Sequence, residues 1–152
     1  MNIVLYRPEI PQNTGNIART CASTGSALHL IRPLGFAIDD VKLKRAGLDY
    51  WHKLDIRYYD GFGAFLSEAR PAALYPVTTH GLKPYTEARF KPDDFLIFGQ
   101  ETAGLPEEIR GAYAENCLRI PMIPQNRSLN LSNTVALVLY EALRQLGFAG
   151  LI

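Results

Sequence analysis

The sequence has little cysteine and no long apolar run, and each shortage excludes a class of protein. Only two of the 152 residues are cysteines, Cys21 and Cys117, and neither belongs to a CxxC or Cys/His pattern, so we expect no disulfide framework and no metal site. The histidines His29, His52 and His80 also lack metal-ligand spacing. No apolar run reaches the roughly 18 residues of a membrane span, and the first ten residues do not resemble a signal peptide. We therefore expect a cytoplasmic protein without a membrane segment.

The sequence also has almost no net charge. The net charge of +1 is far below that of a protein whose surface is covered with basic residues that bind nucleic acid. Residues 1–58 carry eight Lys and Arg against five Asp and Glu, so the N-terminal third is the more basic side. An RNA-binding surface would have to be a local patch, or form where two subunits join. A basic cluster in this region is either such a patch or an ordinary solvated face, and it consists of Lys42, Lys44 and Arg45 with Lys53 and Arg57 nearby.

The length fits one domain, residues 1–152, and the apolar pattern alternates between strand and helix periods. Strands are expected at 2–6, 28–32, 54–59, 72–79 (interrupted at Pro76), 94–98 and 117–120. Helices are expected at 15–24, 39–46, 62–70, 106–113 and 132–146. This alternation predicts an α/β fold with a mostly parallel sheet flanked by helices. Ligands of such sheets bind at the carboxyl ends of the strands, where three polar loops are expected.

The first loop, residues 11–19, joins a strand to a helix. It has one glycine where a dinucleotide-binding turn needs three, so a nicotinamide or P-loop enzyme is disfavoured. Asn13 and Thr14 are good helix N-caps, and Arg19 lies one helical turn beyond Gly15. Arg19 either lies on a solvated helix face or projects beside the loop, where a guanidinium suits a phosphate or a developing oxyanion.

The second loop, residues 98–106, carries Gly99 and Gly104 with Glu101 between them. Two glycines let the backbone approach a ligand closely. The same residues are also consistent with a tight turn that exposes a solvated glutamate.

The third loop, residues 120–133, is rich in amides and hydroxyls and leads into an apolar helix. Ser132 or Asn133 is expected to cap that helix. Ser128 and Asn130 then have no evident structural role, which favours a polar ligand here.

Taken together, the three loops resemble the three motifs of the SPOUT methyltransferases. The matching stretches are Asn13–Arg19, Phe98–Pro106, Ile120–Pro124 and Arg127–Asn133. The resemblance is closest to the TrmL type, whose members are tRNA 2′-O-methyltransferases that act on the wobble nucleotide. Each motif alone is weak, but three in order at these intervals are specific.

The resemblance implies a SPOUT fold with a C-terminal trefoil knot, in a homodimer whose active site lies near the subunit interface. It implies S-adenosylmethionine as the cofactor, S-adenosylhomocysteine as the product, and no metal. The implied partner is the anticodon stem-loop of tRNA, and the implied acceptor is the ribose 2′-hydroxyl of cytidine or a modified uridine at position 34.

The resemblance also assigns residues. Those expected to line the cofactor pocket or to lie beside it are Val77, Thr78, Gly99, Glu101, Gly104, Ile120, Met122 and Ser128. Gln100 stands where many relatives have asparagine, which leaves its role open. Arg19 is the expected catalytic residue, with Ser128 and Asn130 orienting either the cofactor or Arg19. Arginine stays protonated in proteins, so Arg19 would hold a phosphate or stabilise an alkoxide rather than act as the base.

Three alternatives remain from sequence alone. The chain could methylate another tRNA or rRNA site, it could be a nucleotide-binding α/β enzyme of another kind, or it could be a non-catalytic RNA-binding module. Binding of S-adenosylmethionine separates the last of these from an enzyme that uses it.

Overall fold

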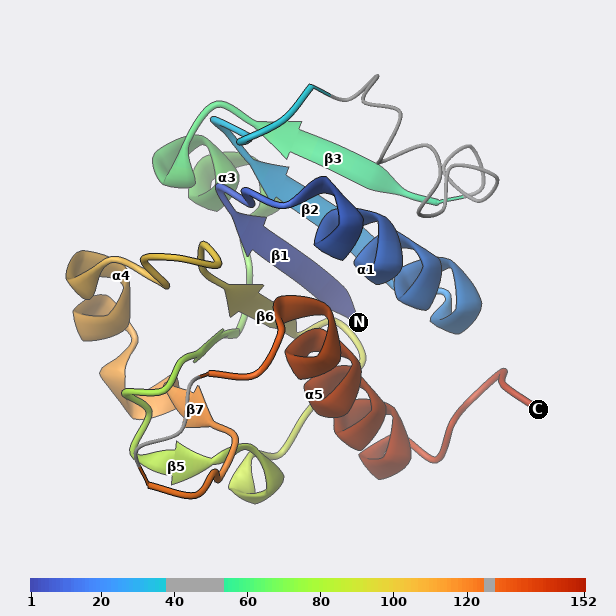
Figure 1. The fold of residues 1–152 in the computed structure, drawn as a ribbon. Helices are drawn as coiled ribbons and strands as arrows, with labels where there is room; N and C mark the ends of the chain where they lie inside the picture. The colour runs from blue at the N-terminus through green and yellow to red at the C-terminus, as the bar shows by residue number, and fades with distance from the viewer. Residues whose placement is uncertain (38–53, 125–127) are drawn as a thin grey trace.

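The protein folds around a seven-stranded parallel sheet (Figure 1). The computed structural model describes residues 1–37, 54–124 and 128–152. The strands, in sheet order, are β3 (Ile56–Tyr59), β2 (Ala27–Ile31), β1 (Asn2–Tyr6), β6 (Phe95–Phe98), β4 (Leu74–Val77), β7 (Leu118–Arg119) and β5 (Lys83–Pro84). The helices are α1 (Pro11–Thr24), α3 (Phe62–Ala69), α4 (Glu107–Ala112) and α5 (Leu131–Gln145), with short 3₁₀ turns at Tyr85–Glu87 and Ala114–Asn116. The α/β prediction with a mostly parallel sheet is confirmed.

Helices cover both faces of the sheet because successive side chains of a strand point to opposite sides. In β1, Ile3 and Leu5 pack into a core with α1 and α5, whereas Val4 and Tyr6 pack with residues of α3 and α4. Both faces of the central strands are therefore buried, as their continuous apolar sequences predict.

Helix α1 begins earlier than predicted, and its N-terminus is capped differently. Pro11 occupies its first position, which suits a residue without a backbone N–H. Asn13 and Thr14, expected as caps, instead lie buried inside the first turn, and the capping residue Ile10 offers no side-chain hydrogen bond. The expected stop is confirmed, because Gly25 closes the helix at φ 64° with its N–H bonded to Cys21 O.

Helix α5 is capped by Asn130, not by Ser132 or Asn133 as expected. The Asn130 side-chain oxygen accepts hydrogen bonds from the Ser132 backbone N–H at 2.9 Å and the Ser132 hydroxyl at 2.7 Å. The expectation that Asn130 has no structural role is therefore wrong.

Two further expectations about the elements need correction. Pro76 does not interrupt its strand, since it pairs with Ile97 inside β4. The two-residue strand β5 was not expected, because such a short segment carries no detectable period. The helix expected at 39–46 and the basic residues from Lys42 to Lys53 lie outside the described residues. Arg57 of the same cluster lies in β3 and forms an ion pair with Asp55.

Neither cysteine is a candidate nucleophile. Cys21 and Cys117 are both buried, and burial raises the pKa of the Cys21 thiol to about 12. None of the helices in the described ranges is long and apolar enough to cross a membrane.

Candidate active site

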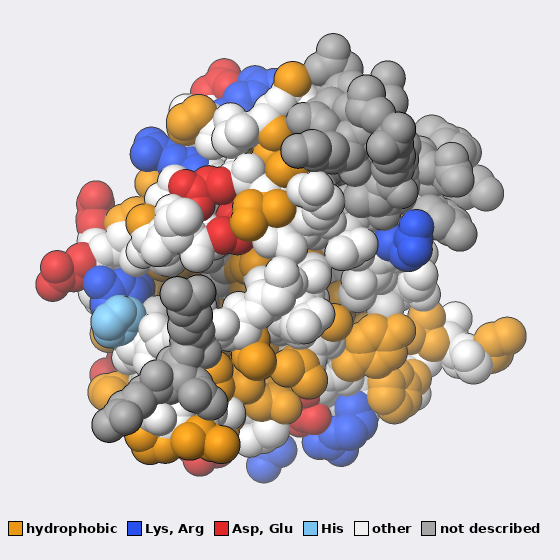
Figure 2. Space-filling model, viewed as in Figure 1, with side chains coloured by type: hydrophobic (Ala, Val, Ile, Leu, Met, Phe, Trp, Pro, Cys, Tyr) orange, Lys and Arg blue, Asp and Glu red, His pale blue; other side chains and the backbone are white. Residues whose placement is uncertain are grey.

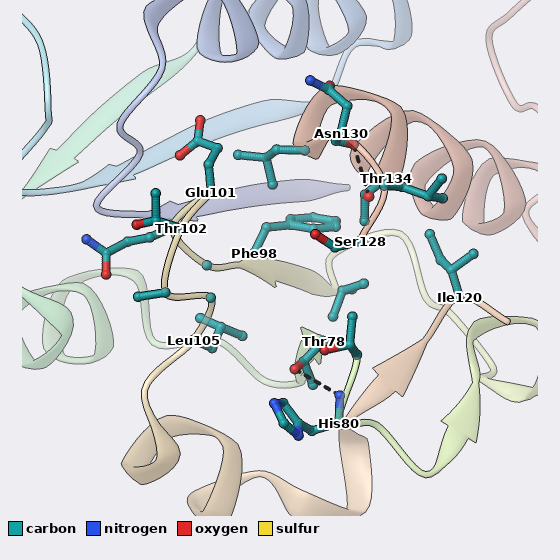
Figure 3. A pocket seen from close by; sticks show the side chains of 18 of the residues that line it. Thr78, His80, Phe98, Glu101, Thr102, Leu105, Ile120, Ser128, Asn130 and Thr134 are labelled. Carbon is teal, nitrogen blue, oxygen red and sulfur yellow. Dashed lines mark hydrogen bonds between the residues drawn. The ribbon is translucent and has the colours of Figure 1, made fainter. Parts of the chain in front are cut away.

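A cavity of about 480 Å³ lies where β6, β4 and β7 end (Figure 3). Its walls come from all three polar loops and from the segment after β4. The lining residues that the argument uses are Ile10, Asn13, Val77, Thr78, His80, Phe98, Gly99, Glu101, Gly104, Arg110, Ile120, Met122, Ser128 and Asn130. The loops share one site because β1, β6 and β7 all end at the same edge of a parallel sheet.

The cavity combines apolar walls with a few hydroxyl and amide groups. Phe98, Ser128 and Ile120 all line it, and in the view of Figure 3 Phe98 and Ser128 lie near the middle with Ile120 to one side. Thr78 lies on the opposite wall, where its hydroxyl accepts a hydrogen bond from the His80 backbone N–H at 3.3 Å. Such a lining suits a ligand with an apolar ring and a polar end.

The second loop is a closed turn that brings its own backbone together. Gln100 and Gly104 exchange backbone hydrogen bonds of 3.2 and 2.9 Å. A Cβ atom at Gly99 would lie 2.1 Å from the carbonyl carbon of Gly104, so no larger residue fits there without a backbone shift. Gly104 has φ 68°, a conformation that favours glycine. The two glycines therefore shape the loop itself.

The Glu101 carboxylate holds the segment that leads into α1. Its oxygens accept hydrogen bonds from the backbone N–H groups of Glu9 at 2.9 Å and Ile10 at 3.2 Å. In return, the Glu9 carboxylate accepts from the Thr102 hydroxyl at 2.8 Å and from its backbone N–H at 3.0 Å. Glu101 is thus no solvated turn residue. It lies at the N-terminal end of α1, where negative charge is favoured.

Asn13 completes the link among the three loops. Its side-chain nitrogen donates to Glu101 Oε1 at 3.1 Å, and its oxygen accepts from Asn130 Nδ2 at 2.9 Å. Asn13 is only 5% exposed. In Figure 3 the Asn130 side chain turns toward α1 and away from the middle of the cavity. One buried amide therefore ties the first loop to both of the others.

All eight residues expected at the cofactor pocket line this cavity, and Asn130 lines it as well. Arg19 does not. It is exposed on α1, and a rotation of 100° per residue places it about 120° around the helix from Asn13. His80 and Arg110 also line the cavity, and neither residue was expected there. Within the described parts of the chain, no three His, Cys, Asp or Glu side chains gather as metal ligands.

The fold and the site define an α/β domain with a ligand cavity built from loops at the carboxyl ends of parallel strands. The model of the SpoU rRNA Methylase family matches residues 1–140, and the chain belongs to that family.

Full-length relatives carry a more specific name. The chain is 50% identical to the tRNA (cytidine(34)-2′-O)-methyltransferase of Escherichia coli (strain K12), over 100% of this chain and 98% of the relative. It is 51% identical to the enzyme of the same name from Saccharophagus degradans, over 98% of this chain and 97% of the relative.

Solved structures agree with this placement. One concerned with the 2-OH methylation of C/U34 on tRNA aligns with a TM-score of 0.91 at 51% identity, covering 96% of this chain and 95% of that one. The SpoU methyltransferase AviRb from Streptomyces viridochromogenes, in complex with the cofactor AdoMet, aligns with a TM-score of 0.85 at 28% identity. That match covers 95% of this chain and 57% of AviRb.

Proposed function

We propose that this protein transfers a methyl group from S-adenosylmethionine to the ribose 2′-hydroxyl of the wobble nucleotide of tRNA. The acceptor is cytidine or a modified uridine at position 34 of the anticodon stem-loop. The observation that carries the proposal is identity of 50% or more, over nearly the whole of both chains, with relatives named for this reaction.

The cavity suits S-adenosylmethionine, the cofactor bound by the AviRb relative. Its volume is in the range of small-molecule sites, its apolar walls suit a purine, and its hydroxyls and amides suit a ribose and an amino-acid end. The residues that would hold the cofactor are Val77, Thr78, Gly99, Glu101, Gly104, Ile120, Met122 and Ser128. When bound, it supplies a methyl group activated by a sulfonium and leaves as S-adenosylhomocysteine.

The protein's own part is to position the ribose hydroxyl and to help the loss of its proton. Alignment of reacting groups can lower a barrier by roughly 7–11 kcal/mol in favourable systems. Ser128, near the centre of the cavity, is placed to orient the reacting groups. Asn130 is a positioning residue that acts through Asn13 and the start of α5.

Arg19 holds the target phosphate or stabilises the forming alkoxide. Because Arg19 is exposed on α1 and does not line this chain's cavity, we propose that it serves the cavity of a second copy across a homodimer interface. Large hydrophobic side chains are exposed on and just beyond α5, at Leu137, Tyr140 and Phe148, and Figure 2 shows hydrophobic side chains over this helix. An exposed hydrophobic patch is typical of an interface between subunits. We propose that the homodimer is cytoplasmic.

Methyl transfer in vitro tests the proposal. The protein is mixed with labelled S-adenosylmethionine and total tRNA that lacks the 2′-O-methyl mark, and a parallel reaction contains rRNA. We expect incorporation into tRNA, together with calorimetric binding of the cofactor by the protein alone. Labelling of rRNA alone would overturn the substrate, and the absence of cofactor binding would overturn the enzyme class.

A further inference from the structure

A second, open cleft lies beside the cavity, where β1, β2 and β3 end. Its lining residues are Arg7, Arg32, Pro33, Leu34, Phe36, Ala37 and Asp60. Arg7 directly follows β1, Arg32 follows β2, and Asp60 follows β3. Figure 2 shows basic, acidic and hydrophobic side chains close together over this edge of the sheet.

Both arginines of the cleft lie over aromatic rings. The Arg7 guanidinium carbon is 5.1 Å from the centre of the Tyr6 ring, and that of Arg32 is 5.4 Å from the centre of the Tyr58 ring. A guanidinium at this distance from a ring face gains a cation–π attraction, and its N–H groups can still donate to a phosphate. Two arginines at the ends of adjacent strands, each over an aromatic ring, therefore supply donors to the same cleft.

Arg7 is held in place by its backbone. Its φ of 50° lies in the left-handed region, which residues other than glycine rarely adopt, and its N–H bonds to Ile31 O at 2.9 Å. Arg32 forms an ion pair with Asp60, from Nη1 to Oδ1 at 2.8 Å. Their side chains are 48% and 81% exposed, so the pair is weak, and a phosphate can compete for the arginine.

The cleft and the cavity share a wall, the segment Arg7–Ile10. Arg7 lines the cleft, Glu9 is bound to Thr102 of the second loop, and Ile10 lines the cavity. Across the cleft, Gly35 donates to Pro8 O at 2.9 Å. A Cβ atom at Gly35 would lie 2.8 Å from the Glu9 Cα, so the two segments are in close contact. The cleft and the cavity therefore lie on either side of one short segment.

We propose that this cleft binds the phosphate backbone of the substrate RNA next to the nucleotide that enters the cavity. The inference rests on the proposed function and adds to it the surface that holds the flanking nucleotides. Arg7 and Arg32 donate to neighbouring phosphates, and the half-buried Phe36 offers a ring to an unpaired base.

The test measures binding of an unmodified tRNA transcript by the full-length protein at several salt concentrations. The variants are Arg7→Asn, chosen because asparagine tolerates a positive φ, Arg32→Gln, and the double variant. The matched control is Arg144→Gln. Arg144 is also an exposed arginine paired to one carboxylate at 2.8 Å, but it lies in the last turn of α5, which runs toward the amino ends of the strands (Figure 1).

We expect each single variant to weaken RNA binding about tenfold, as the loss of a charge-assisted hydrogen bond does. The slope of log affinity against log salt should fall by about 0.7 for each arginine removed. Binding of S-adenosylmethionine, measured by calorimetry, and the urea midpoint should stay as in the unaltered protein. The control should change neither affinity nor slope.

Unchanged RNA affinity in the double variant would overturn the inference, as would an equal loss in Arg144→Gln or a parallel loss of cofactor binding. If the double variant does not fold, Arg7→Lys with Arg32→Lys keeps the charges and removes the planar fork. That variant should still bind more weakly than the unaltered protein, and equal binding would contradict the proposal. If the variants keep both methyl transfer and RNA affinity, the proposed role of the cleft is wrong and the proposed function is unaffected. If the unaltered protein transfers no methyl group, the proposed function itself is wrong.

Discussion

Asn130 donates a hydrogen bond of 2.9 Å from Nδ2 to Oδ1 of Asn13, 117 residues earlier in the chain. Asn13 donates in turn to Glu101 Oε1 at 3.1 Å. Because a carboxylate only accepts, the Asn13 amide must face Glu101 with its nitrogen and Asn130 with its oxygen. The three loops around the cavity are thus joined through one buried side chain.

Asn13→Ala should loosen the cavity. It removes the partner of Asn130 Nδ2 and one of the two hydrogen bonds to Glu101 Oε1, and the loss of two such bonds costs about 1–3 kcal/mol in the free energy of unfolding. Urea unfolding should show this decrease, and calorimetry should show weaker binding of S-adenosylmethionine. The control Asn16→Ala changes an exposed residue of the same helix and should alter neither quantity. If both variants behave alike, Asn13 does not hold the loops.

Gly99→Ala should damage the same site through the backbone. The new Cβ would lie 2.1 Å from the carbonyl carbon of Gly104, so the turn must open. We expect cofactor binding to fall at least about tenfold, because the turn forms part of the cavity wall. Gly111→Ala is the matched control, since nothing lies within 4 Å of its Cβ and alanine favours the helix by roughly 0.5–1 kcal/mol. Full cofactor binding by Gly99→Ala would contradict the geometry.

Stability should depend on pH through His29, which is fully buried. Its ring nitrogens lie 2.7 Å from the Tyr59 hydroxyl and 3.2 Å from Asn2 Oδ1, and burial lowers its pKa from 6.5 to about 4, with the nearby Arg57 charge acting in the same direction. Between about pH 4 and pH 6.5, the unfolded chain therefore binds a proton at His29 more readily than the folded protein does. The stabilising contribution is present above pH 6.5 and is lost as the pH falls toward 4.

Urea unfolding at pH 7 and pH 5 measures this effect. We expect His29 to account for a decrease of roughly 2 kcal/mol between the two. His29→Gln should remove that part of the decrease, whereas His80→Gln, which changes an exposed histidine, should keep it. An unchanged pH dependence in His29→Gln would show that other groups cause it.

Arg19→Ala should separate catalysis from cofactor binding. If Arg19 holds the phosphate or the forming alkoxide, methyl transfer should fall by about 100-fold or more, the usual loss when such a donor is removed. Calorimetric binding of S-adenosylmethionine should not change, because the proposed contacts of Arg19 are with the RNA phosphate or the forming alkoxide and not with the cofactor. The control is Arg89→Ala, another exposed arginine. Normal methylation by Arg19→Ala would remove Arg19 from the mechanism.

Helices and strands were predicted well where the local spacing of apolar residues determines their bounds. They were predicted less well where contacts with residues far along the chain determine them. The apolar run of β1 and the stop at Gly25 are local, and both were predicted correctly. The start of α1 was not, because the Glu101 carboxylate bound there comes from a loop about 90 residues away. Asn130 was taken as a ligand-binding residue because its capping bonds to Ser132 depend on where α5 begins.

The cofactor-pocket residues came from the resemblance to a family rather than from spacing. Their common cavity depends on the sheet order, which places β6 beside β1 although the 88 residues from Arg7 to Asp94 lie between the two strands in the chain. His80 was passed over because a lone histidine after a strand carries no signal. The knot, the homodimer and the catalytic roles of Arg19, Ser128 and Asn130 stay predictions.

The most direct test of the central claim is to find the atom that receives the methyl group. Unmodified tRNA is treated with the protein and S-adenosylmethionine carrying a deuterated methyl group, then digested and mapped by mass spectrometry. The account predicts a single label on the ribose 2′-oxygen of nucleotide 34. A label on a base, or on the ribose of any other nucleotide, would contradict it.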